Sequence, residues 1–137
     1  MKRNHVKSLA GWIIILGHVG LIALILFYLD AFLDAKQKMQ VILTLSPVTA
    51  AYFVSVVKGF VAEQGILDAG PAVNLNFVGI SILVPLCLIG FLAYLILRYP
   101  SSIAGDVNSL QTWTAAAEVA LGGAVGIVVD DLFPKKS

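Results

Sequence analysis

Four long apolar segments occupy most of this 137-residue chain, at residues 9–29, 41–61, 77–97 and 111–129. An α-helix rises about 1.5 Å per residue, so roughly 20 residues cross the roughly 30 Å hydrocarbon layer of a bilayer. All four segments have about this length. The pattern therefore predicts an all-α fold, a polytopic membrane protein built as a bundle of four transmembrane helices.

The composition predicts a single membrane domain. Hydrophobic residues make up 59% of the chain and charged residues 12%, whereas about 25% of the residues of a soluble domain are charged. The longest stretch between apolar segments, residues 62–76, is shorter than the roughly 50 residues that a separate soluble domain needs. We expect residues 1–137 to form one integral membrane domain, with the lipid bilayer as its main partner.

Several classes of function are disfavoured by what the sequence contains. The net charge of +1 argues against binding to nucleic acid, which requires a basic patch or stripe. The single cysteine, Cys87, excludes an internal disulfide and a multi-cysteine metal site, and we expect it to be a buried, inert thiol. No phosphate-binding glycine loop, zinc-protease motif or nucleophile elbow is present. The sequence thus predicts no catalytic residue, no metal and no cofactor.

The basic residues predict the orientation in the membrane. With four spans, both termini lie on one side, and six of the nine Lys and Arg residues belong to that side. Cytoplasmic loops carry an excess of Lys and Arg, so we expect a multi-pass protein of the cell membrane with both termini in the cytoplasm. The six are Lys2, Arg3, Lys7, Lys58, Lys135 and Lys136, and the other three are Lys36, Lys38 and Arg98.

The fourth apolar segment is the least hydrophobic, and it carries Glu118, which costs a few kcal/mol at the centre of a bilayer. Small residues recur in it at every fourth position. This spacing lets helix backbones approach closely, so we expect the segment to pack within the bundle or between copies of a homo-oligomer. The predicted packing residues are Ala116, Ala120 and Ala124 in one row, and Gly122 and Gly126 in the row that contains Glu118.

Counting residues from the ends of the segments predicts a partner for Glu118. Glu118 lies roughly 10 Å and His18 roughly 16 Å from the same membrane surface, a difference that side chains can bridge. Lys58 lies about 15 Å deeper than Glu118 and is expected to extend to the cytoplasmic headgroups. His18 and Glu118 are therefore the predicted buried ionisable pair.

Two interpretations are open for each member of this pair. His18 is either a neutral histidine that bridges helices or a proton relay or sensor. Glu118 is either a protonated carboxyl in a structural hydrogen bond or a charge that faces water in a pore or cavity.

The second segment offers another surface that water could line. Thr44, Ser55 and Lys58 fall on one helical stripe, which makes them further candidates for a pore. Pro47 in this segment and Pro85 in the third each remove a helical hydrogen bond. They are either hinges of a gate or ordinary membrane prolines whose freed carbonyls are satisfied by neighbours.

Three function classes agree with these features. We expect first an oligomeric channel-like or pore-forming protein. The first alternative is a membrane sensor or scaffold that recruits or regulates a cytoplasmic protein partner, and small membrane proteins of antiviral defence agree with it in size and number of spans. The second alternative is a small proton-coupled exporter that uses one membrane carboxylate.

Overall fold

The protein is described by a computed structural model over residues 3–62 and 75–132. These residues form four α-helices, a short 3-10 turn and no strand, so the all-α prediction is confirmed for the described part of the chain. The elements are α1 (Arg3–Phe27), η1 (Leu29–Ala31), α2 (Ala35–Ala62), α3 (Leu75–Leu97) and α4 (Val107–Leu132).

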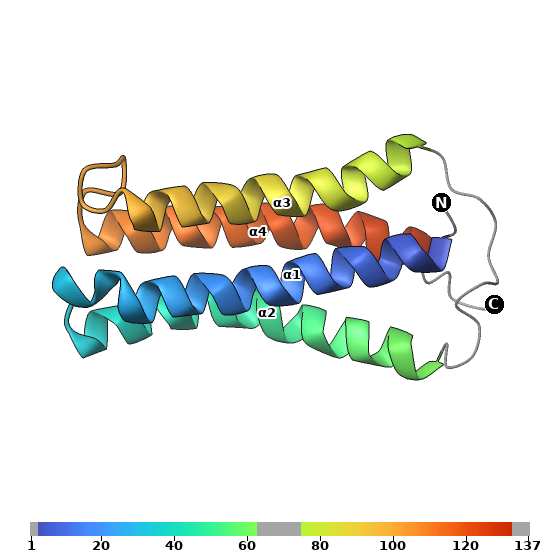
Figure 1. Ribbon diagram of the computed structural model, residues 1–137, viewed down its shortest axis with the longest axis horizontal. Helices are drawn as coiled ribbons and strands as arrows, with labels where there is room; N and C mark the ends of the chain where they lie inside the picture. The colour runs from blue at the N-terminus through green and yellow to red at the C-terminus, as the bar shows by residue number, and fades with distance from the viewer. Residues whose placement is uncertain (1–2, 63–74, 133–137) are drawn as a thin grey trace.

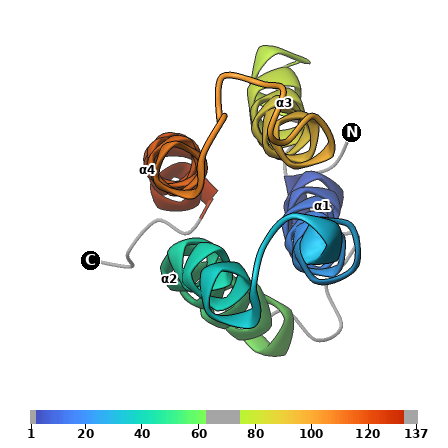
Figure 2. The same ribbon diagram turned by 90° about the vertical axis from the view of Figure 1, so that its left-hand side faces the viewer.

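The four helices run along one common axis (Figure 1). Seen along that axis, they form a ring in which α1 packs against α2 and α3, and α4 packs against the same two helices (Figure 2). As a result, α1 and α4 face each other across the centre of the bundle. The first residue of α1 and the last residue of α4 lie at the same end (Figure 1).

The interior of the bundle is built from one stripe on each helix. On α1 the buried side chains of Ile14, His18, Leu21 and Ile25 follow one another at steps of three or four residues. This is the 3.6-residue period of a helix with one inward face. Leu21 and Ile25 belong to a hydrophobic core cluster that also includes Val41, Leu45, Leu92, Leu95, Ile96, Leu110 and Ala117.

The outer surface of the bundle is apolar. Large hydrophobic side chains are more than half exposed on all four helices, among them Leu16 and Phe27 of α1, Leu43 of α2, Leu83 of α3 and Val119 of α4. Ser8–Ala31 and Val78–Leu97 are both long and apolar enough to cross a membrane. Only 28% of the most apolar window of each is buried, whereas the core helix of a soluble protein is mostly buried.

The expectation for Cys87 was wrong, because its side chain is exposed on α3. The sequence of α3 is apolar around its whole circumference, so its hydrophobic pattern does not distinguish the inward face from the outward face.

Side-chain caps set the starts of α2 and α4 earlier than the apolar segments begin. The amide of Gln37 donates to Asp34 Oδ1 at 2.8 Å, and the Asp34 amide donates to Gln37 Oε1 at 3.0 Å. This reciprocal arrangement is a capping box. Asp106 caps α4 through the amide and hydroxyl of Ser109, at 2.9 and 2.8 Å, and these bonds hold the pKa of the Asp106 carboxyl below its usual value.

Further contacts tie the helices together at this capped end. The Tyr28 hydroxyl donates to the carbonyl of Leu97 at 2.8 Å, which links the ends of α1 and α3. An ion pair joins Lys38 to Asp30, and Phe91 of α3 meets Trp113 of α4 edge-on with ring centroids 6.2 Å apart. The η1 end is thus a firmly connected end of the bundle.

One glycine marks a close approach between α1 and α3. A Cβ atom on Gly17 would lie 2.5 Å from Ile89 Cδ1 and 3.1–3.2 Å from its two γ carbons, whereas a Cβ on Gly20 would meet nothing within 4 Å. The Gly17 backbone and the Ile89 side chain therefore leave no room for another methyl group.

Gly17→Ala is accordingly expected to lower the free energy of unfolding by about 1 kcal/mol, because Ile89 must leave its rotamer to admit the methyl group. Gly20→Ala is the matched control and should be neutral or stabilising, since it adds helix propensity at an open position. Reversible unfolding in mixed detergent micelles measures both. Equal effects of the two substitutions would contradict the close contact.

Candidate functional site

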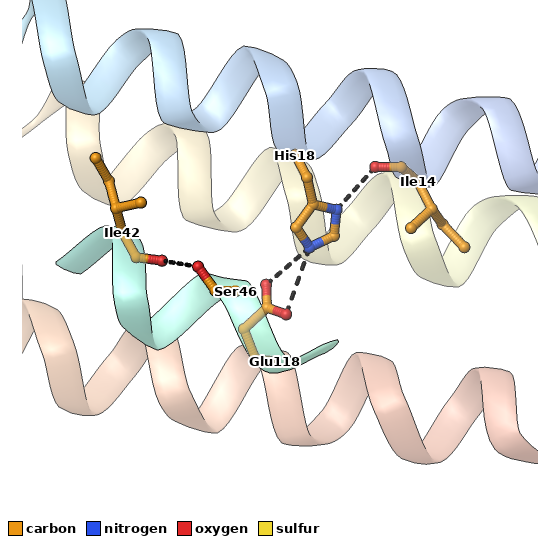
Figure 3. A network of polar contacts seen from close by, with 5 residues as sticks. All are labelled: Ile14, His18, Ile42, Ser46 and Glu118. Atoms are coloured by element: carbon orange, nitrogen blue, oxygen red, sulfur yellow. Dashed lines mark hydrogen bonds and ion pairs between the residues drawn. The ribbon is translucent and has the colours of Figure 1, made fainter. Parts of the chain in front are cut away.

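His18 and Glu118 meet at the centre of the bundle. His18 Nε2 lies 3.1 Å from Glu118 Oε1 and 3.4 Å from Oε2 (Figure 3). His18 is 0% exposed and Glu118 is 2% exposed. Since the two residues come from α1 and α4, which face each other across the ring, their hydrogen bond crosses the middle of the bundle. The structure thus brings together the two residues that residue counting paired.

The second ring nitrogen of His18 fixes the position of one proton. Nδ1 lies 2.8 Å from the carbonyl oxygen of Ile14, one turn earlier on the same helix (Figure 3). A carbonyl oxygen only accepts hydrogen bonds, so Nδ1 must carry the hydrogen. In a neutral imidazole Nε2 is then an acceptor.

The contact between Nε2 and the carboxyl group therefore needs one further proton. Either a protonated Glu118 donates its O–H to a neutral His18, or an imidazolium N–H of His18 donates to a Glu118 carboxylate. Both arrangements have no net charge and satisfy the buried atoms. The pair thus avoids an uncompensated charge inside an apolar bundle, which would cost several kcal/mol.

The other polar groups of the bundle interior are neutral hydroxyls. On α2, the hydroxyl of half-buried Ser46 donates to the carbonyl of Ile42 on its own helix, at 2.9 Å (Figure 3). One turn before Glu118, the buried Thr114 hydroxyl donates to the carbonyl of Leu110 at 2.7 Å. Among the side chains that the structure describes, His18 and Glu118 are the only buried basic and carboxyl groups, and the other buried titratable group is the phenol of Tyr99 beyond the end of α3.

A buried hydroxyl on α3 lacks a partner. Ser81 is 3% exposed, and its oxygen has no hydrogen-bond partner within the described part of the chain. Pro85 follows four residues later and has no N–H, so the Ser81 carbonyl also loses its usual helical donor. Sequence reasoning missed this serine. Its spacing of four residues from a proline inside an apolar run is the signal that identifies it.

The predicted pore stripe of α2 is only partly described. The Thr44 hydroxyl donates to the carbonyl of Gln40 on its own helix, at 2.9 Å. Ser55 and Lys58 belong to α2, but their side chains lie outside the described residues. The stripe therefore stays a prediction.

The two small-residue rows of α4 lie in different environments. Glu118 is buried and Gly122 half-buried on the inner side, whereas Ala116 and Ala120 are exposed. Ala124 is half-buried, and the surroundings of Gly126 lie outside the described residues. Within one chain the inward packing of α4 comes instead from Ala117 and Leu121, and Ala116 and Ala120 lie on the outer side of the helix.

Both predicted hinge residues lie inside continuous helices, Pro47 within α2 and Pro85 within α3.

No protein-family model, curated protein or solved structure matches the chain. Its function is therefore inferred from the buried pair and from the apolar surface that surrounds it.

Proposed function

We propose that the chain is a small four-span integral membrane protein that assembles into a homo-oligomeric, channel-like complex. The observation that carries this proposal is the inverted polarity of the bundle. Its ionisable pair is at the centre, and large apolar side chains cover its outside. Helices α1 and α3 have the length and hydropathy of membrane spans. Helices α2 and α4, of 28 and 26 residues, pack in the same ring and are long enough to span beside them.

The position of the pair supports a gated path rather than a permanently open one. A path for ions along the axis of a single bundle has to pass between α1 and α4, where His18 and Glu118 are hydrogen-bonded. Glu118 points into its own bundle and is 2% exposed, so a simple assembly of copies does not create a ring of free Glu118 carboxylates. In the proposed channel, the closed state is the one in which this hydrogen bond is formed.

The outward face of α4 is the proposed contact between copies. Ala116 and Ala120 present small side chains one turn apart, and Val119 between them is 74% exposed. Small residues at this spacing allow helix backbones to approach closely in a membrane. In this assembly the termini are cytoplasmic, as the distribution of basic residues favours.

Two other functions compete with a channel. A proton-coupled exporter is favoured by one observation, namely that the only buried carboxyl among the described side chains shares its hydrogen bond with a titratable group. A sensor or scaffold for a cytoplasmic partner would use the charged tails. Lys2, Lys135 and Lys136 of these tails lie outside the described residues.

The proposal is tested with the purified full chain in liposomes that contain a monovalent cation and a fluorescent reporter of membrane potential. We expect cation flux above that of empty liposomes at one or more of acidic, neutral and alkaline pH. An exporter would instead release protons when a cationic substrate is added. Absence of flux at all three pH values in correctly inserted protein would contradict the channel.

A further inference from the structure

We propose that His18 and Glu118 form a proton-binding site that latches α1 to α4 and releases them when the shared proton leaves. The effect of this latch on ion flux rests on the proposed channel function. The latch itself rests on the direction of the hydrogen bonds, on the position of the pair and on the proline pattern of the other two helices.

Loss of the shared proton breaks the contact. Nδ1 of His18 keeps its hydrogen on the Ile14 carbonyl, so the proton that leaves for water is the one between Nε2 and Glu118. What remains is a neutral imidazole whose Nε2 lone pair faces a carboxylate, with no hydrogen between them. The hydrogen bond is lost, and the buried carboxylate has no counter-charge.

Gain of a proton has a different result. A second proton gives an imidazolium whose Nε2–H donates to the carboxylic acid of Glu118, so the hydrogen bond between α1 and α4 is kept. The hydrogen bond of the latch is therefore lost only on the alkaline side.

No other charge compensates the deprotonated pair within the described side chains. The buried polar groups of the other elements are the neutral hydroxyls of Ser81 on α3 and Thr114 on α4, with half-buried Ser46 on α2. Cys87 and Tyr94 of α3 are exposed. Lys58 is twelve residues beyond Ser46, about 18 Å further along α2.

The other two helices of the ring carry prolines at one common level. Pro47 lies twelve residues from the start of α2, and Pro85 lies twelve residues from the end of α3. Both distances are counted from the η1 end and correspond to about 18 Å along the axis. A proline removes a hydrogen bond of the helix and is the usual point at which a helix bends.

The pair lies close to the same level. His18 is nine residues from the end of α1 and Glu118 eleven from the start of α4, about 14 and 16 Å from the η1 end. Beyond this level, α2 and α3 diverge towards the end at which α1 begins (Figures 1 and 2). Helices α1 and α4, which face each other across the ring, are thus held together by a proton-dependent hydrogen bond. Helices α2 and α3 each contain a proline at which they can bend. Loss of the bond between α1 and α4 lets α2 and α3 move further apart.

Ser81 is placed to report this opening. It lies on α3 four residues beyond Pro85, away from the capped η1 end, and it is buried without a hydrogen-bond partner in the described residues. Water that enters an opened bundle would reach this hydroxyl.

The test uses the full chain in liposomes, with Ser81→Cys in a Cys87→Ser background. A charged, membrane-impermeant thiol reagent is applied across a pH series, and its rate is corrected with the same protein unfolded, which accounts for thiol ionisation. We expect the corrected rate to rise about tenfold or more from acidic to alkaline pH, the size of effect that loss of a charge-assisted hydrogen bond produces.

Glu118→Gln is the decisive variant. Its amide N–H donates to Nε2 of neutral His18 and has no titratable proton, so the corrected rate should stay low at alkaline pH. Ser46→Ala is the control, because it removes a half-buried hydroxyl that donates to the Ile42 carbonyl on its own helix, and it should keep the wild-type response. An equal rise in wild type and Glu118→Gln would overturn the latch.

Two readouts separate the latch from the channel. Labelling that changes with pH while no flux occurs supports the latch and contradicts the channel. Flux with pH-independent labelling supports the channel and contradicts the latch.

If Ser81→Cys does not fold, hydrogen exchange of α1 and α4 in the protein with the natural Ser81 replaces labelling. Each exchange rate is divided by the intrinsic rate of the unfolded chain at the same pH, because exchange is base-catalysed. A corrected rate that rises with pH in wild type but not in Glu118→Gln supports the latch, and an equal rise in both overturns it.

Discussion

Leu86→Asp is expected to prevent stable insertion of α3 into the membrane. Leu86 lies at the midpoint of α3 and is 48% exposed on the outside of the bundle. If that surface faces lipid, an aspartate there costs about 2.5–3.5 kcal/mol on the scale of membrane insertion. In a water-soluble bundle, the same change at a half-exposed position would be tolerated.

Leu97→Asp is the matched control for this substitution. Leu97 is 45% exposed and ends the same helix, where a charge reaches the headgroups, so its replacement should leave insertion nearly intact. Resistance of the chain to alkaline extraction from membranes measures both variants. Equal membrane retention of Leu86→Asp and wild type would contradict a lipid-facing α3.

The pairing of His18 with Glu118 was predictable because the rise of a helix is fixed. Once the ends of two apolar segments are assigned, counting residues gives the depth of each side chain. Because Asp34 and Asp106 cap α2 and α4, these helices begin several residues before their apolar segments. The earlier start does not change the similar depths of His18 and Glu118.

The inward faces of α3 and α4 were less predictable. Cys87 lies on a helix that is apolar on all sides, so the hydrophobic pattern of α3 does not indicate whether this residue is buried or exposed. On α4, small residues occupy several neighbouring rows, and the structure buries Ala117 rather than Ala116 or Ala120. Membrane helices lack the polar outer face that identifies the inner one in soluble bundles.

The order of the helices around the ring was also beyond the sequence. The short connection of residues 28–34 makes α1 and α2 neighbours, and residues 98–106 do the same for α3 and α4. Helix α1 also packs against α3, and this contact depends on how well their side chains fit together, as Ile89 fits against Gly17. This contact puts α1 and α4 on one diagonal, and so puts the pair on the axis.

Removal of one member of the pair is expected to be the most destabilising change inside the bundle. His18→Leu leaves the Glu118 carboxyl buried without a partner, and Glu118→Leu leaves Nε2 of His18 in the same condition. An unsatisfied buried polar group costs up to about 3 kcal/mol. The double substitution removes both polar groups, so it should cost less than the sum of the single ones, with a coupling energy of about 1–2 kcal/mol.

Unfolding of the four proteins in mixed detergent micelles gives this coupling energy. Ser46→Ala combined with Glu118→Leu is the comparison, because the Ser46 hydroxyl bonds to Ile42 and not to the pair, and its effect should simply add. Additive effects of His18→Leu and Glu118→Leu would mean that the 3.1 Å contact contributes nothing to stability, and the helices would then be held by apolar packing alone. A latch between α1 and α4 requires a favourable coupling energy between His18 and Glu118. If their hydrogen bond does not stabilise the closed bundle, its loss cannot shift the bundle to an open state.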